Sequence, residues 1–338
     1  MKYYAGIDLH SNNSVVVVID EADAVHYRKR LRNELTEIAA ALYPFERELA
    51  GVVVESTYNW YWLVDGLMES GYQVHLANTS AMVQYSGLKY GDDLSDARWL
   101  AHLLRLGILP EAHIYDKRLR PLRDALRKRS QLVRMRTSNV LGAQNIIARG
   151  SGMRISGSGI KKQTDEEVDT LGLGEDVGLA IKSNLAVMKC IQEQVRIIEK
   201  RVLSQARTMQ GYDGLMSVPG IGKILGMTIL LEAGTMERFA TVGDFSSYCR
   251  CVGSTRTSNG KSKGKGNTKN GNKYLGWAFI EAAHFAVRYN EQIRKYYQRK
   301  AAKTKRIVAI KAVAHKLARA SYYILRDGVT FEVDKAFG

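Results

Sequence analysis

Apolar residues follow two different periods along the 338-residue chain. Short apolar runs rich in β-branched residues lie at 3–9, 14–20, 51–55 and 72–76, which is typical of buried strands. The intervening stretches 34–49, 59–70 and 93–106 show helical spacing. Strands that alternate with helices indicate an α/β layer fold. Because a short turn joins the first two strands, we expect a mixed sheet.

Beyond residue 115 the helical period dominates. Apolar residues at 181, 185, 188, 191, 195, 198 and 202 form a narrow seam, which either packs within its own subunit or joins two subunits as a coiled coil. The Gly/Ser-rich stretch 150–159 predicts a flexible linker, and residues 253–273 predict a long loop. We therefore expect three domains, over 1–115, 116–210 and 211–338. The second is a helical connector, and the third is mainly α-helical.

Charge distinguishes these regions further. The chain has 50 Lys and Arg against 34 Asp and Glu, a net charge of +16. Residues 251–338 hold 19 basic and 5 acidic residues, and residues 117–136 hold 9 and 1, so the rest is acidic overall. Basic segments neutralise phosphates and release counterions, which favours a nucleic-acid partner over a merely solvated surface.

The sequence shows no membrane span or signal peptide, and three cysteines cannot build a disulfide framework, so we expect a cytoplasmic protein.

Four carboxylates occupy positions that call for a partner. Asp8 lies within an apolar strand, Glu55 ends a valine run, and Asp93 and Asp96 share one face at the start of a helix. An isolated carboxylate in an apolar strand is costly unless it is paired or bound to a cation. If the four converge, Mg²⁺ ions that clamp the oxygens of a phosphodiester explain them best. Each residue also has an alternative role. Asp93 and Asp96 could be charges that complement the helix dipole, and Glu55 could cap the exposed end of its strand. Asp92 is an alternative to Asp93 in the same motif.

The C-terminal region contains a turn that favours phosphate binding. Pro219-Gly220-Ile221-Gly222-Lys223 leads into an apolar helix, and backbone N–H groups at Gly220, Gly222 and Lys223 would meet a DNA phosphate, as in a helix-hairpin-helix element. The start of an ordinary helix is the alternative. His10 we expect to be a satisfied hairpin histidine.

Three segments together resemble a known family. Gly6-Ile7-Asp8-Leu9-His10, Val54-Glu55-Ser56-Thr57 and Asp93-Leu94-Ser95-Asp96-Ala97 resemble the DEDD transposases of the insertion-sequence one-ten and eleven-eleven groups, relatives of the pilin-gene invertases. The Pro219–Gly222 turn and the later Ser/Gly/Lys loop are similar to the C-terminal transposase domain of that family. The resemblance implies an RNase H-like (RuvC-like) N-terminal domain, a helical or coiled-coil connector and a mainly α-helical C-terminal domain.

The same resemblance implies an activity and partners. In this family a serine attacks DNA and forms a covalent link, while a non-coding bridge RNA pairs with double-stranded target and donor DNA. Homodimers assemble into a tetramer whose composite sites join the carboxylates of one subunit to the serine of another.

The nucleophile is best matched by Ser258-Asn259-Gly260-Lys261, which fits the family's Ser-x-Gly-Lys pattern. Because a serine hydroxyl is a weak nucleophile, it needs a base, a metal or a cationic neighbour. Arg256, Lys261 and Lys263 are candidates to stabilise charge on the phosphate. Ser254 and Ser262 remain rivals, and a loop of ordinary serines is the alternative.

The sequence thus predicts a prokaryotic, cytoplasmic recombinase that uses Mg²⁺ and bridge RNA. Arg127, Lys128 and Arg129 of the basic segment are predicted to bind the RNA. One alternative is a hydrolytic endonuclease resembling a Holliday-junction resolvase, which would use the four carboxylates alone. Another is a nucleic-acid-binding protein with a decayed site. The added domain with its basic serine loop favours the recombinase over the resolvase-like endonuclease, and the protein with a decayed site would show no metal-dependent cleavage of any DNA.

Overall fold

The computed structural model describes residues 1–82, 92–253, 255–265 and 270–338, and the chain forms two compact units, Met1–Lys117 and Arg118–Gly338. The predicted boundary after residue 115 lies two residues from this division. The connector and the C-terminal region share the second unit, so a further boundary at residue 210 stays a prediction. No described helix is long and apolar enough to cross a membrane.

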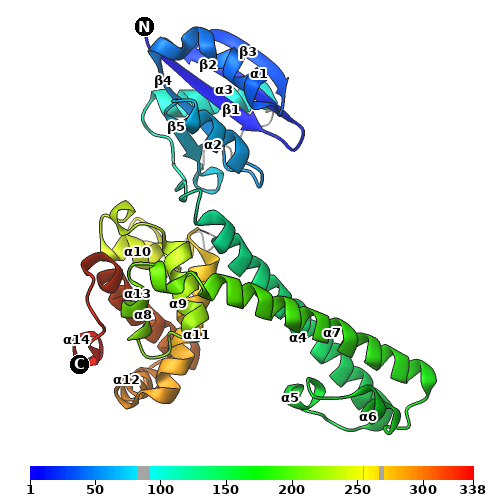
Figure 1. The fold of residues 1–338 in the computed structure, drawn as a ribbon. Coiled ribbons are helices and arrows are strands. Elements are labelled where there is room, and N and C mark those ends of the chain that lie inside the picture. Colours follow the sequence, from blue (N-terminus) through cyan, green and yellow to red (C-terminus); the bar gives the residue numbers. More distant parts are fainter. Residues whose placement is uncertain (83–91, 254, 266–269) are drawn as a thin grey trace. The chain divides into compact units, whose positions relative to one another are not determined.

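The first unit is a five-stranded sheet with helices on both faces (Figure 1). The strands, in the order β3-β2-β1-β4-β5, are β1 (Tyr3–Leu9), β2 (Asn13–Asp20), β3 (Val25–Arg32), β4 (Leu49–Glu55) and β5 (Val74–Ala77). The helices are α1 (Leu35–Leu42), α2 (Tyr61–Glu69) and α3 (Asp93–Arg105), with 3-10 turns η1 (Tyr43–Glu48) and η2 (Thr79–Ala81). Since β1 pairs antiparallel with β2 and parallel with β4, the predicted mixed sheet is confirmed.

Two elements differ from the sequence prediction. Strand β3 was not predicted, because this edge strand is mostly charged and buries few side chains, Leu31 among them. The helix predicted over 34–49 ends at Leu42. Pro44 has no N–H to continue an α-helix, and the chain goes on as the 3-10 turn η1.

Side-chain alternation along β1 assigns residues to the two faces of the sheet. Ile7 and Leu9 pack in the cluster that contains α1 and α2, so Gly6 and Asp8 face α3. A Cβ built on Gly6 would lie 1.9 Å from the carbonyl oxygen of Ala97 in α3. Helix α3 therefore lies directly on β1 because residue 6 has no side chain.

The second unit is mainly helical (Figure 1). Its helices are α4 (Arg120–Ser151), α5 (Gly157–Ile160), α6 (Asp165–Asp169), α7 (Glu175–Leu203), α8 (Tyr212–Met216), α9 (Lys223–Ala233), α10 (Val242–Tyr248), α11 (Lys273–Tyr289), α12 (Glu291–Ala301), α13 (Arg306–Asp327) and α14 (Val333–Phe337). The 3-10 turns η4 (Ala206–Thr208) and η5 (Met236–Arg238) and the strands β6 (Thr255–Ser258) and β7 (Lys261–Lys265) complete it.

Helices α4 and α7 form an antiparallel pair. Ile147 near the end of α4 packs with Ile181 near the start of α7, and Leu126 packs with Val202 at the opposite end. The apolar seam of α7 is therefore covered by the same chain, in agreement with packing within the subunit. The stretch 150–159 is not a linker, because its ends belong to α4 and to the short helix α5, which Ser156 caps.

The segment predicted as a loop over 253–273 contains a β-hairpin. Strand β6 pairs antiparallel with β7. Asn259 and Gly260 between them both have positive φ, of 52° and 70°. An Asn-Gly pair with this geometry makes a two-residue hairpin turn, and the sequence did contain this signal.

Candidate active site

The sheet topology brings Asp8 and Glu55 together. Strands β1 and β4 are parallel neighbours in which Ile7 pairs with Val54, so the next residues, Asp8 and Glu55, reach the same edge. Since Val53 packs in the cluster with Leu100 of α3, Glu55 shares the α3 face with Asp8. Asp8 is only 4% exposed, and Glu55 is half-buried and hydrogen-bonded to it.

Helix α3 supplies the other two carboxylates from its first turn. Asp92 is the N-cap: its carboxylate accepts a hydrogen bond from the Ser95 N–H at 2.7 Å, and the Ser95 hydroxyl accepts one from the Asp92 backbone N–H at 2.9 Å. The helix therefore begins at Asp93, with Asp96 one turn on. Asp92 is therefore used as a helix cap, whereas the Asp93 carboxylate lies near Asp8 and His10.

His10 lies between the carboxylates. Its Nε2 is 3.2 Å from Asp8 Oδ2 and 3.3 Å from Asp93 Oδ2. The histidine backbone is fixed, because its carbonyl oxygen accepts hydrogen bonds from the side-chain amides of Asn33 and Asn59, both at 3.0 Å. His10 is thus part of the carboxylate cluster, a position that the expectation of a satisfied hairpin histidine did not include. Its spacing of two residues from Asp8 was the available signal.

Arg30 is the second residue that the sequence analysis missed. It forms an ion pair with Asp93 and also donates to the Asn13 side chain at 2.7 Å. Arg30 lies on β3 opposite Val15, on the face that α3 covers. Without β3, nothing in the sequence placed Arg30 near the carboxylates.

The carboxylate cluster holds more negative charge than the neighbouring cations neutralise. Burial, the hydrogen bond to Asp8 and the charges of Asp8 and Asp96 raise the pKa of Glu55 to about 8. Burial and the charges of Asp8, Asp93 and Asp92 raise the pKa of Asp96 as well. The hydrogen bond from Arg30 lowers the pKa of Asp93. The inner carboxylates therefore repel one another more than the protein's own cations compensate.

The donor set fits a divalent cation. Among the described residues, Asp8, His10 and Asp93 each offer a ligand atom, and these atoms lie within 4.8 Å of one another. The pKa of Glu55 and that of Asp96 both respond to the charge of Asp8, which places all four predicted carboxylates in one electrostatic cluster. Carboxylate oxygens at a half-open edge are ligands that Mg²⁺ accepts.

The serine region lies in the second unit. Ser258 is the last residue of β6, is exposed, and pairs across the turn with Lys261. Lys263 is also exposed. Ser254 and the side chains of Arg256 and Ser262 lie outside the described part of the chain. The hairpin therefore places one candidate serine beside one lysine.

The predicted RNA-binding residues have different surroundings. Arg127 donates to the Glu232 carboxylate at 2.6 and 2.8 Å, and Arg129 pairs with Glu199 at 2.7 Å. Lys128 is exposed and donates to Gln131 at 3.2 Å. Two of the three cations thus take part in ion pairs that hold helices together.

The predicted phosphate-binding turn precedes α9. Gly220 has φ +88°, and a Cβ there would lie 2.2 Å from the carbonyl oxygen of Ala282 in α11. Packing against α11 therefore already requires a glycine at this position. Gly222 has open space around it, and Lys223, the first residue of α9, is exposed. A phosphate contact at this turn stays a prediction.

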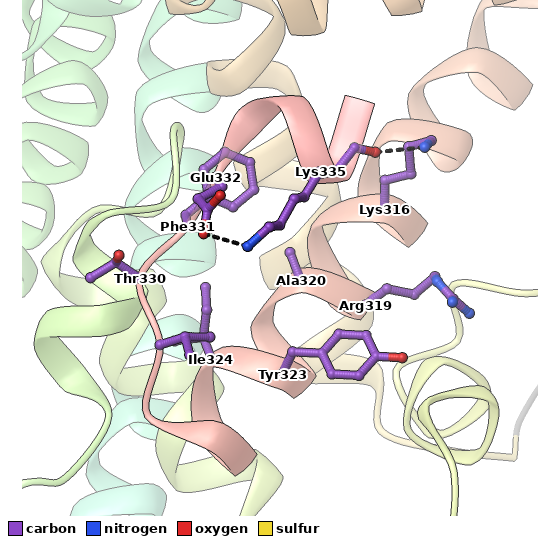
Figure 2. A pocket seen from close by; sticks show the side chains of 11 residues that line it. Lys316, Arg319, Ala320, Tyr323, Ile324, Thr330, Phe331, Glu332 and Lys335 are labelled. Atoms are coloured by element: carbon purple, nitrogen blue, oxygen red, sulfur yellow. Dashed lines mark hydrogen bonds and ion pairs between the residues drawn. The ribbon is translucent and has the colours of Figure 1, made fainter. Parts of the chain in front are cut away.

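A cavity of about 480 Å³ lies between α13 and the segment that follows it (Figure 2). Two of its lysines are bonded within the protein. Lys316 donates to the carbonyl oxygen of Ala336 at 2.6 Å, and Lys335 pairs with Glu332 at 2.7 Å. Because Glu332 is the sole acidic residue that lines it, this cavity does not offer the carboxylate chemistry of the first unit.

Two family models match different parts of the chain, and the first match extends beyond the division at Lys117 into α4. Residues 5–147 match a family model of DEDD transposases of the IS110 type, and residues 212–298 match the model described as the transposase IS116/IS110/IS902 family. A similar protein is the insertion element IS110 uncharacterized 43.6 kDa protein of Streptomyces coelicolor, 24% identical over 155 residues. The match covers 46% of this chain and only 38% of that relative.

Proposed function

The chain belongs to the IS110 family of transposases, and from this premise we propose that it cleaves and exchanges strands of double-stranded DNA under the guidance of a bridge RNA. One observation carries the proposal. Asp8, Glu55 and the first turn of α3 meet at one edge of the sheet, where excess negative charge requires a cation. No described basic residue other than Arg30 and His10 pairs with this cluster.

Asp8, Glu55, Asp93 and Asp96 are the proposed Mg²⁺ ligands. Bound there, Mg²⁺ would supply positive charge to the attacking and leaving oxygens of a phosphodiester. His10 Nε2 lies 3.2 Å from Asp8 Oδ2 and 3.3 Å from Asp93 Oδ2, so the ring helps to position these two carboxylates. Arg30 holds Asp93 from the outer side.

Ser258 is the proposed nucleophile. Its hydroxyl gives up a proton, Oγ bonds to phosphorus, one P–O bond to the neighbouring sugar breaks, and the departing sugar oxygen takes up a proton. A hydroxyl of a second strand reverses the step, so rejoining needs no external energy source. Lys261, opposite Ser258 on the hairpin, stabilises the negative charge on the phosphate, and Arg256 and Lys263 assist it.

The proposed partners are double-stranded target and donor DNA and a bridge RNA. Homodimers assemble into a tetramer on the DNA, with carboxylates from one subunit and Ser258 from another. The compartment is the prokaryotic cytoplasm. Gly220, Gly222 and Lys223 contact the DNA backbone, and the basic face of α4, with Lys128 exposed on it, contacts the RNA.

A covalent adduct separates this proposal from the hydrolytic alternative. Reactions with a nicked DNA substrate in Mg²⁺ are resolved on denaturing gels. We expect a protein–DNA adduct that disappears in Ser258→Ala, while DNA binding remains. Asp8→Ala and EDTA each should abolish both cleavage and adduct.

The possible results differ in what they exclude. If Ser254→Ala or Ser262→Ala removes the adduct instead, the mechanism stands with another nucleophile. Free 5′-phosphate ends with no adduct under any condition support the resolvase-like hydrolase. Full cleavage by Asp8→Ala would contradict the metal site.

RNA retention is tested at Lys128. Lys128→Glu reverses an exposed charge without breaking an ion pair, whereas Arg127→Gln also disturbs Glu232. We expect protein purified from cells that carry the whole element to retain a specific RNA, and Lys128→Glu to retain less of it. The absence of any enriched RNA with the unaltered protein would contradict the guided mechanism.

A further inference from the structure

A small groove opens between α4 and α11 in the second unit. Its cavity measures about 310 Å³, and the residues that line it are Arg129, Ser130, Val133, Arg134, Lys273, Tyr274 and Trp277. The lining is thus aromatic and basic, and it contains no acidic residue. Helix α4 contains most of the basic segment, and α11 is the first helix after the Ser258 hairpin.

Trp277 presents the exposed aromatic surface of this groove. It is 39% exposed, and among the described residues no other ring stacks on it. Tyr274, one turn earlier, is occupied, because the Arg127 guanidinium lies 4.5 Å from its ring centroid and the Lys273 ammonium 5.2 Å. Tryptophan has an apolar ring and a polar N–H, and it is enriched at binding interfaces for this reason.

Two exposed cations line the groove together with the indole. Arg134 and Lys273 are exposed, and neither forms an ion pair with a described carboxylate. Arg129, by contrast, is held by Glu199. An aromatic face together with cations is the combination that binds single-stranded nucleic acid, since bases stack on the ring and phosphates contact the charges.

We propose that the α4–α11 groove binds an unpaired nucleotide, with its base stacked on Trp277 and its phosphate contacted by Arg134 and Lys273. This rests on the proposed function, in which nucleic acid lies along α4. Stacking on the indole is open to any base, because every base has a flat π-face, so the groove holds a strand in place without requiring a particular sequence.

Binding of short single strands to the full-length protein tests the site. The probes are a uridine RNA oligonucleotide, a thymidine DNA oligonucleotide and an abasic strand of the same length. The protein has four tryptophans, of which Trp277 alone lies in residues 118–338, so the part of the quenching that depends on Trp277 reports contact of a base with this ring. We expect quenching by both base-bearing strands, and loss of this quenching in Trp277→Phe.

Affinity measurements separate stacking from charge. Trp277→Ala should weaken binding about tenfold or more, as loss of one stacked base does, while Trp277→Phe keeps a ring and most of the affinity. Phe285→Ala is the matched control, since Phe285 is a 43% exposed aromatic residue of the same helix outside the groove. Arg134→Ala should lower the slope of log affinity against log salt by about 0.7, the effect of one phosphate contact on a single strand.

Three results would overturn the site: equal affinity for the abasic strand, Trp277→Ala within twofold of the unaltered protein, or binding without fluorescence quenching. A preference for the RNA or the DNA probe identifies which strand occupies the groove. Asp8-dependent DNA cleavage is measured on the same preparation. If the unaltered protein cleaves DNA but one of these three results is found, this inference alone is contradicted. If the unaltered protein shows no Asp8-dependent cleavage, the proposed function is contradicted.

Discussion

Glu232 in the second unit and Asp8 in the carboxylate cluster of the first unit are both buried, but their surroundings are opposite. In the second unit Glu232 on α9 is 2% exposed, and it accepts hydrogen bonds from Arg123 at 3.0 Å, from Arg127 at 2.6 Å and from the Asn272 side chain at 2.7 Å. Although burial acts to raise it, these partners hold the pKa of Glu232 below its usual range. The charge is satisfied inside the protein.

The carboxylate cluster around Asp8 in the first unit lacks such partners. Glu55 is buried beside Asp8 and Asp96, and its pKa rises to about 8. Only the outermost member, Asp93, has an arginine partner, and its pKa falls. The comparison shows that burial alone does not mark a functional carboxylate. A carboxylate surrounded by cations joins helices, whereas carboxylates surrounded by one another are prepared for a cation from outside.

The largest expected effect is a loss of stability when the buried Glu232 carboxylate is removed. Glu232→Gln leaves Arg123 and Arg127 without their counter-charge, so we expect a loss of about 3–5 kcal/mol in the free energy of unfolding. Urea denaturation measures it. Glu291→Gln is the control, because that exposed residue forms an i,i+4 pair with Lys295 and should cost at most about 0.5 kcal/mol. Equal losses in both variants would remove the distinction.

The second prediction concerns the position of α3. In Gly6→Ala the new methyl group meets the Ala97 carbonyl, so α3 must move away from β1 and carry Asp93 and Asp96 with it. We expect DNA cleavage to fall about 100-fold, as misplacement by about 1 Å does in other enzymes. Gly222→Ala, at a position with open space around it, is the control for stability. Undiminished cleavage by a folded Gly6→Ala protein would show that α3 need not contact β1 closely.

The third prediction uses metal binding as the readout. Mg²⁺ at about 100 times its dissociation constant should stabilise the protein by about 2.7 kcal/mol, because the ion binds the folded state alone. Thermal unfolding with Mg²⁺ and with EDTA measures this difference. Asp8→Ala should lose it, and Glu232→Gln should keep it. Stabilisation that survives in Asp8→Ala would place the cation elsewhere.

The smallest expected effect is the pH dependence of stability without metal, which should have opposite signs at the two sites. Folded Glu55 keeps its proton up to about pH 8, whereas the unfolded chain releases it near 4.5, so its contribution to stability falls as pH rises between these values. Folded Glu232 has a lowered pKa, so its contribution is present above 4.5 and is lost as pH falls through the folded pKa.

Melting temperatures in EDTA from about pH 3 to about pH 8 test both signs, because the Glu232 contribution is lost below 4.5. The melting temperature of Glu55→Gln should rise relative to the unaltered protein as pH increases, and that of Glu232→Gln should rise relative to it as pH decreases. The same sign in both variants would show that the two environments are alike.

The hydrophobic pattern determined the strands that carry Asp8 and Glu55, the start of α3, the α7 seam and the apolar α9. These features are local, because strand and helix periods show directly which side of an element is buried. The metal hypothesis followed from the same pattern, since a charge in an apolar strand stands out in the sequence itself.

Only the tertiary structure decided which charges meet. Strand β3 enters the sheet at its edge and brings Arg30 beside Asp93, while α4 crosses α9 and commits Arg127 to Glu232. In the sequence Arg30 and Arg127 look alike, as members of basic runs, and His10 looks like part of a turn. The partner of a charge depends on strand order and helix crossing, which join residues 63 and 105 positions apart, and no local period encodes such pairings.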